Sequence, residues 1–213
     1  MAKRGGFRQR DVRRSGATRT PRDRILVVVE GRCTEKNYFC DLRRIEKLAS
    51  LVVVLSSTQS DPVGIVDYAK KVIERGTETI EPRSFEYVYT VFDHDGREEQ
   101  YREALELMQR SDGAYRTQDH SPIHFTAIPS IPCFELWFLL HFEEIHPHEM
   151  HQKEVLKRLK SVWPDYEKNL EGTYLKTKEK LEKAIRHSVR LRQRGTGCDA
   201  VTHADILVRK LLK

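Results

Sequence analysis

The sequence has few features of a secreted or membrane-bound protein. Its four cysteines form no Cys-x-x-Cys pair, its longest aliphatic run is far too short to span a bilayer, and no cleavable signal pattern opens the chain. Hydrophobic residues make up only 38% of the chain, whereas charged residues make up 33%. This composition predicts a helix-rich cytoplasmic protein with reduced thiols and no membrane partner. The 213 residues are enough for one domain of moderate size with an appendage.

Positive charge is concentrated at the N-terminus. Residues 1–24 hold nine Lys or Arg and two Asp, a net charge of +7, so the rest of the chain carries −1 of the total +6. Because residues 1–22 contain three glycines and few apolar side chains, they are predicted to form a basic, disordered arm. Such an arm favours contact with phosphate groups, and the alternative is a tail that only increases solubility.

Two strongly apolar segments end in acidic residues. Residues 25–29 are five branched aliphatics followed directly by Glu30, and residues 87–92 lead into Asp93 and Asp95. Such segments predict parallel strands that are buried on both faces. Because burial of an unpaired carboxylate is costly, the acids are expected at the strands' C-terminal ends, where α/β sheets bind ligands. Three carboxylates at one sheet edge predict a Mg²⁺ or Mn²⁺ site, and the alternative for the aspartates is a simple turn.

Strand and helix patterns alternate along the first part of the chain. The expected order is β-α-β-α-β-α-β, with a helix opening at Asp61-Pro62, and it predicts an α/β domain over residues 23–145 with a roughly four-stranded, mainly parallel sheet flanked by helices. Residues 130–142 are apolar nearly all round, which predicts a core helix. Residues 146–213 are charged and amphipathic, which predicts a C-terminal helical extension packed on the same domain.

The arrangement of strand, Glu-Gly, helix and a later strand ending in Asp-x-Asp resembles the Toprim domain of topoisomerases, bacterial primases and several nucleases. More closely, the chain resembles the RloB-like family from about Arg22 to the C-terminus. The matching segments are residues 29–39, 91–95, 132–143 and 201–203. The chain departs from the family pattern at Ile131, where Asn is usual, and at Gly96, where a further acid is common.

The resemblance implies a Toprim-like fold and a metal-dependent nuclease that cleaves phosphodiester bonds as an anti-phage or abortive-infection effector. RNA, including tRNA, is preferred over DNA as the substrate, and an ATPase partner encoded nearby is expected. Glu30 matches the Toprim glutamate, which is a general acid/base or a ligand, and Asp93 and Asp95 match its metal-binding aspartates. The alternatives are a non-catalytic module that binds nucleotide or nucleic acid or regulates an ATPase, and a small metal-dependent phosphotransferase. The oligomeric state is left open, a homo-oligomer included.

Glu135 is an acid inside the apolar segment. If Pro132 opens the core helix, the first turn points toward the sheet edge, so Glu135 is predicted to join the pocket as a catalytic residue. The alternative is a structural ion pair with a base such as His141.

Four more residues are candidates for places around the metal or the phosphate. Glu35 is either a helix-dipole partner or an acid that lies behind the metal ligands. His94, between the two aspartates, is a candidate to approach the scissile phosphate or to orient its neighbours. Lys36 and Arg97 are candidates for phosphate contacts, with simple solvation as the alternative.

Overall fold

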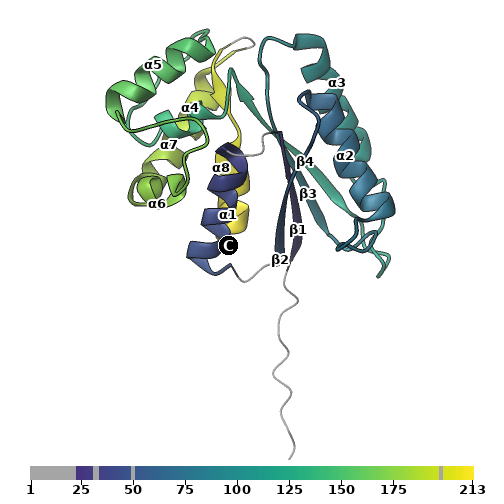
Figure 1. Ribbon diagram of the computed structural model, residues 1–213. Helices are drawn as coiled ribbons and strands as arrows, with labels where there is room; N and C mark the ends of the chain where they lie inside the picture. The colour runs from purple at the N-terminus through teal and green to yellow at the C-terminus, as the bar shows by residue number, and fades with distance from the viewer. Residues whose placement is uncertain (1–22, 31–33, 49–50, 197–198) are drawn as a thin grey trace, which may run out of the picture.

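The computed structural model describes residues 23–30, 34–48, 51–196 and 199–213, so the basic arm predicted for residues 1–22 lies outside the described part (Figure 1). A five-stranded sheet in the order β2-β1-β3-β4-β5 forms the centre of the molecule. The strands are β1 (Arg24–Val29), β2 (Leu51–Ser56), β3 (Tyr87–Asp93), β4 (His124–Ile131) and β5 (Val201–Thr202). The first four are parallel, and β5 pairs antiparallel with β4.

The predicted α/β class and mainly parallel sheet are therefore confirmed, but the expected count of four strands misses β5. This strand has only two residues, which is too short to produce an alternating pattern in the sequence.

Helices cover both faces of the sheet. One face carries α2 and α3, whereas α1 and the C-terminal helices lie on the other (Figure 1). The helices are α1 (Thr34–Glu46), α2 (Pro62–Arg75), α3 (Glu98–Ser111), α4 (Glu135–Leu139), α5 (Gln152–Val162), α6 (Thr173–Thr177), α7 (Leu181–Arg194) and α8 (Ala204–Leu211), with a short 3-10 turn at Lys178–Lys180. No helix in these described ranges is both long and apolar enough to cross a membrane.

Strand β1 is buried on both faces because its side chains alternate between two apolar cores. Ile25, Val27 and Val29 join the core that contains α1 and the C-terminal helices. Leu26 and Val28 join the core beneath α2 and α3. The prediction of a doubly buried strand is thus confirmed: after Arg24 at its start, the next polar side chain is that of Glu30, directly after the strand ends.

The opening of α2 also follows the sequence. Asp61 accepts a hydrogen bond from the Gly64 amide through Oδ1 at 2.8 Å, and Pro62 occupies the first helical position, where its missing N–H has no cost.

The predicted core helix over residues 130–142 is wrong in its first part. Strand β4 continues to Ile131, a cis Ile131–Pro132 peptide follows, and α4 spans only Glu135–Leu139. The strand persists because it pairs with β3 as far as Ser130 opposite Asp93, which satisfies the backbone groups of this buried segment. An apolar run is compatible with a buried strand as well as with a buried helix.

The C-terminal helices share the apolar core on the α1 side of the sheet. Asp205 of α8 is buried, and its Oδ1 accepts hydrogen bonds from Arg192 at 2.7 Å and from Ser188 at 2.8 Å. Arg192 also donates to Asp205 Oδ2 at 3.1 Å, so a bidentate ion pair connects α7 to α8.

Candidate functional site

The first two acids of the site come from neighbouring parallel strands. Val29 of β1 lies opposite Val91 of β3, so both strands end at the same sheet edge. The Glu30 amide donates to the Val91 carbonyl at 3.1 Å, and the Asp93 amide donates in return to Glu30 Oε2 at 3.1 Å. The pairing of β1 with β3 therefore brings Glu30 and Asp93 together.

The loop after β3 places Asp95 at the rim of the site. The His94 amide donates to the Ser130 carbonyl at 2.9 Å, and Asp95 then adopts a left-handed conformation with φ of 47°. Because the backbone is no longer extended there, Asp95 is exposed while Asp93 is partly buried. The charge of Asp95 still contributes to raising the pKa of Asp93, although burial and three other carboxylates contribute more.

The His94 ring is fixed by its own loop and by α3. Its Nε2 pairs with Glu98 Oε2 at 2.9 Å, and its Nδ1 lies 3.2 Å from the Gly96 amide. The ring also packs edge-on against Tyr101, with 5.0 Å between the centroids. These contacts fix the His94 ring against the loop that carries Asp93 and Asp95, and its role at a phosphate stays a prediction.

Two more carboxylates reach the same edge from the α1 side. Glu35 lies in the first turn of α1 and Glu135 in the first turn of α4, and their exposed fractions are only 8% and 4%. Burial raises the pKa of Glu35 from 4.5 to about 7, and the charges of Glu135 and Glu30 add to the rise. Burial raises the pKa of Asp93 well above its usual range, with Glu35, Glu135 and Glu30 as the next causes.

Five carboxylates thus converge at the ends of β1 and β3 and at the starts of α1 and α4. We call them the carboxylate cluster: Glu30, Glu35, Asp93, Asp95 and Glu135. The pKa of Glu30 is raised as well, first by burial, while its hydrogen bond from the Asp93 amide opposes the rise.

Glu135 contacts other residues than the sequence suggested. Tyr166 donates a hydrogen bond to Glu135 Oε1 at 3.3 Å, and Lys168 Nζ lies 3.9 Å from the same oxygen. The alternative partner, His141, instead pairs through Nδ1 with the Trp137 carbonyl at 2.9 Å. Burial lowers the pKa of His141 to about 4, so this histidine is neutral at pH 7 and carries no charge to pair with an acid.

Glu135 also reaches the site by a route that differs from the predicted one. Pro132 does not open α4, because the residue that caps this helix is Phe134. Glu135 faces the cluster because β4 ends beside β3, and its catalytic role stays a prediction.

The basic candidates differ in their surroundings. The exposed Arg97 side chain donates through Nη1 to the Ser60 carbonyl, and its positive charge lowers the pKa of Glu30. Lys36, beside Glu35 on α1, forms no ion pair among the described residues. Burial and the charges of Glu135 and Asp93 raise the pKa of the Cys133 thiol well above its usual range, which keeps it protonated and unreactive.

The chemistry of the carboxylate cluster fits a hard divalent cation, because every candidate donor is a carboxylate oxygen. Asp93 Oδ1 is buried and has no hydrogen-bond partner, which also favours a cation there. Within the described ranges, however, no three His, Cys, Asp or Glu side chains are arranged closely enough to hold a metal ion. The residues therefore fit the ion by their chemistry, whereas their arrangement is not a closed coordination shell.

An open pocket of about 630 Å³ adjoins the cluster beside Asp95. His94, Tyr101, Pro132 and His151 are among its lining residues, so it is formed jointly by the loop after β3 and the segment before α5. It provides room for a ligand next to the carboxylates.

Sequence reasoning missed Tyr166 and Lys168. Both lie in the loop after α5, which is fixed to the start of α1: the Asn169 amide donates to Thr34 Oγ1 at 3.3 Å, and Asn37 donates to the Asn169 carbonyl at 3.1 Å. No local pattern in residues 163–170 connects this loop to strands more than 70 residues earlier.

The comparisons with known proteins identify the family. A family model described as "RloB-like protein" matches residues 25–211, which is most of the chain, so the protein belongs to the RloB-like family. The searches of curated proteins and of solved structures found no significant match.

Proposed function

We propose that this RloB-like protein is a Toprim-type nuclease that uses a divalent cation to cleave phosphodiester bonds in nucleic acid. The observation that carries the proposal is the position of Asp93: its Oδ1 is buried without a hydrogen-bond partner, and burial, followed by the charges of four other carboxylates, raises its pKa. Negative charges gathered at the carboxyl ends of parallel strands favour a cation as their partner. A phosphate can approach these acids closely only when such a cation is present.

The proposed roles follow from the surroundings of each acid. Asp93 and Asp95 would hold Mg²⁺ or Mn²⁺, and Glu30 would ligate it or move a proton. When bound, the ion would stabilise negative charge on the phosphate in the transition state. Glu35, with a pKa of about 7 in the metal-free protein, holds its proton about half of the time near neutral pH. Glu135 is kept in place by Tyr166.

The biological part of the proposal comes from the family resemblance. It is that the protein acts as an anti-phage or abortive-infection effector, with RNA, including tRNA, ahead of DNA as the substrate and with an ATPase as a partner.

The second candidate function is binding without cleavage. It is favoured because, among the described residues, no three potential ligands are arranged closely enough to hold a metal ion. In this case the same sheet edge and the adjoining pocket of about 630 Å³ bind a nucleotide or a nucleic acid without cleaving it, and the protein regulates or partners an ATPase.

Cleavage assays separate the two functions. Total RNA and plasmid DNA are incubated with Mg²⁺ or Mn²⁺ and with the wild-type protein, Asp93→Ala, Asp93→Asn or the control Asp165→Asn. Asp165 is exposed and outside the cluster, so its variant should cleave as the wild type does. Both Asp93 variants should lose cleavage while remaining folded. Full cleavage by Asp93→Asn would refute the assignment, and no cleavage by the wild type under any condition would support the binding module.

A further inference from the structure

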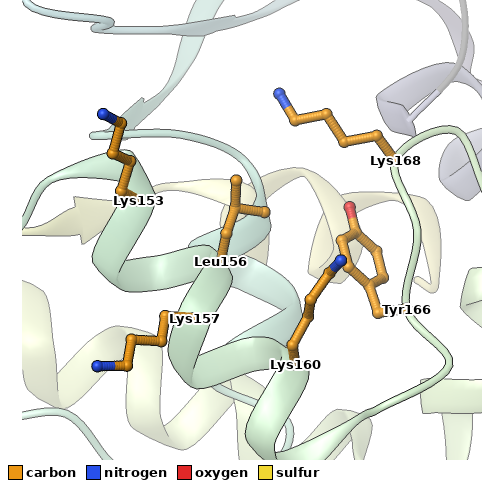
Figure 2. Close-up of a pocket in the computed structure, with 6 residues that line it drawn as sticks. All are labelled: Lys153, Leu156, Lys157, Lys160, Tyr166 and Lys168. Atoms are coloured by element: carbon orange, nitrogen blue, oxygen red, sulfur yellow. The ribbon is translucent and has the colours of Figure 1, made fainter.

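A pocket on the helical side of the molecule is lined mainly by lysines (Figure 2). Its volume is about 360 Å³. We call it the lysine pocket, and its lining residues are Lys153, Leu156, Lys157, Lys160, Tyr166 and Lys168. The first three lysines follow one another on α5 at intervals of four and three residues, which places them on neighbouring positions of one helix face.

Among the residues that the structure describes, no acid pairs with the three lysines of α5 that line the pocket. The ion pairs of this helix involve other residues: Arg158 contacts Glu143 at 2.9 Å and Glu154 at 3.9 Å, and Glu154 also pairs with His148 at 3.4 Å. In the part of the chain that the structure describes, Lys153, Lys157 and Lys160 form no ion pair. Like charges gathered in this way repel each other and attract an anion.

Two lining residues of the lysine pocket also contact the carboxylate cluster. Tyr166 and Lys168 line the pocket, and both contact Glu135 Oε1, at 3.3 Å and 3.9 Å. Figure 2 shows Lys153 and Lys168 extending toward the same side, with Leu156 between them and Tyr166 below Lys168. A ligand in the pocket therefore lies directly beside the cluster.

The row of lysines is longer than a single phosphate group. Lys153 and Lys160 are seven residues apart on a helix that rises 1.5 Å per residue, which is about 10 Å. One strand of a duplex advances about 3.4 Å along the helix axis per nucleotide, so this distance corresponds to about three nucleotide steps. The spacing favours a polymer over a mononucleotide.

We propose that the lysine pocket is a track that binds the phosphate backbone of a nucleic-acid strand and leads it to the carboxylate cluster. The inference rests on the proposed nuclease function for what happens to the strand at the cluster, whereas the binding itself requires no metal. Lys168 lies at the junction, where its charge faces Glu135 on one side and the track on the other.

The test measures binding of a short, fluorescently labelled single-stranded RNA, and of DNA with the same sequence, in EDTA over a series of salt concentrations. The wild type is compared with the triple variant Lys153→Gln, Lys157→Gln and Lys160→Gln. All three side chains are exposed and glutamine is a good helix former, so the variant should fold. Each phosphate contact contributes about 0.7 to the slope of log affinity against log salt for a single strand, so the slope should fall by about 2.

The matched control removes three exposed cations from outside the pocket: Lys71→Gln, Arg75→Gln and Arg116→Gln. Its slope should equal that of the wild type. An unchanged slope in the pocket variant, or an equal fall in the control, would overturn the proposal. If the pocket variant kept its nucleic-acid slope but lost binding of poly-glutamate, the pocket would belong to an acidic protein partner and the proposal would again fail.

Cleavage with Mg²⁺ then distinguishes the track from the nuclease function. The pocket variant should need more substrate for half-saturation and should keep the wild-type rate at saturation. If the wild type cleaves no substrate but the slopes differ as expected, the nuclease function fails and the track stands. If the wild type cleaves and the slopes are equal, the track fails and the nuclease function stands.

Discussion

Replacing Glu35 by Gln should stabilise the metal-free protein at alkaline pH and leave its stability at acidic pH almost unchanged. Glu35 is buried in the first turn of α1, and burial together with the charges of Glu135 and Glu30 raises its pKa from 4.5 to about 7. An acid with a raised pKa stabilises the folded state while it is protonated. This contribution is fully present below pH 4.5 and is lost as the pH rises through about 7.

The size of the effect follows from the shift. The pKa rises by about 2.5, and one pKa unit corresponds to 1.36 kcal/mol, so ionisation of Glu35 costs about 3 kcal/mol of unfolding free energy at pH 8. Glutamine resembles the protonated acid in shape and cannot ionise, so Glu35→Gln avoids this cost. For a chain of 213 residues, about 3 kcal/mol corresponds to a rise in melting temperature of roughly 6–12 °C.

The assay is thermal unfolding in EDTA at pH 5 and at pH 8. Other groups titrate over the same range, so the informative quantity is the difference in melting temperature between variant and wild type at each pH. Glu103→Gln on α3 is the control, because Glu103 is exposed and its charge has little influence on folding. The difference should be large at pH 8 for Glu35→Gln and close to zero for Glu103→Gln.

The same difference for Glu35→Gln at both pH values would refute the reasoning, because it would show that the carboxyl group does not change its protonation in this interval. A melting temperature lowered at pH 8 would show that a charged Glu35 is required by the fold, for example as a partner of the α1 helix dipole.

Two further predictions concern Glu135 and the basic arm. Glu135→Gln should weaken metal affinity or cleavage rate by about 10- to 100-fold and change the melting temperature little, as checked by metal titration and kinetics. Normal activity with a melting temperature many degrees lower would instead make Glu135 a structural residue. Deleting residues 1–21 removes seven Lys or Arg and should lower the salt slope of nucleic-acid binding by a few units, at about 0.7 to 0.9 per phosphate contact. An unchanged slope would assign the arm to another role, such as contact with an acidic partner.

The centre of the fold was predictable because its signals are local. Residues 25–29 and 87–92 have no polar side chain except Thr90 and the two tyrosines, which favours strands buried on both faces. An acid follows each of these segments. The close approach of Glu30 and Asp93 needs one more fact, that β1 and β3 are direct neighbours in the sheet. Parallel strands joined by helices allow this order, but the sequence does not fix it.

The segment around Ser130 was not predictable because tertiary contacts decide its structure. The Ser130 hydroxyl pairs with the Thr202 hydroxyl at 2.9 Å, and the two residues lie opposite each other in β4 and β5. This contact joins parts of the chain that are 72 residues apart. The neighbours of Glu135 are hidden for the same reason, since Tyr166 follows it by 31 residues and belongs to a charged loop.

The electrostatics of the carboxylate cluster and the lysine pocket suggest why one protein would hold both. Each group of like charges is unfavourable by itself: burial raises the pKa of Glu30 and Asp93 most, and the neighbouring carboxylates raise it further. They do not neutralise each other directly, because the only ion pair between them in the described part of the chain is that of Lys168 with Glu135, at 3.9 Å. A divalent cation among the acids and a phosphate backbone along the lysines would relieve both costs at once, and the two ligands would attract each other at the junction. We therefore infer that metal and nucleic acid bind this protein more tightly together than either does alone.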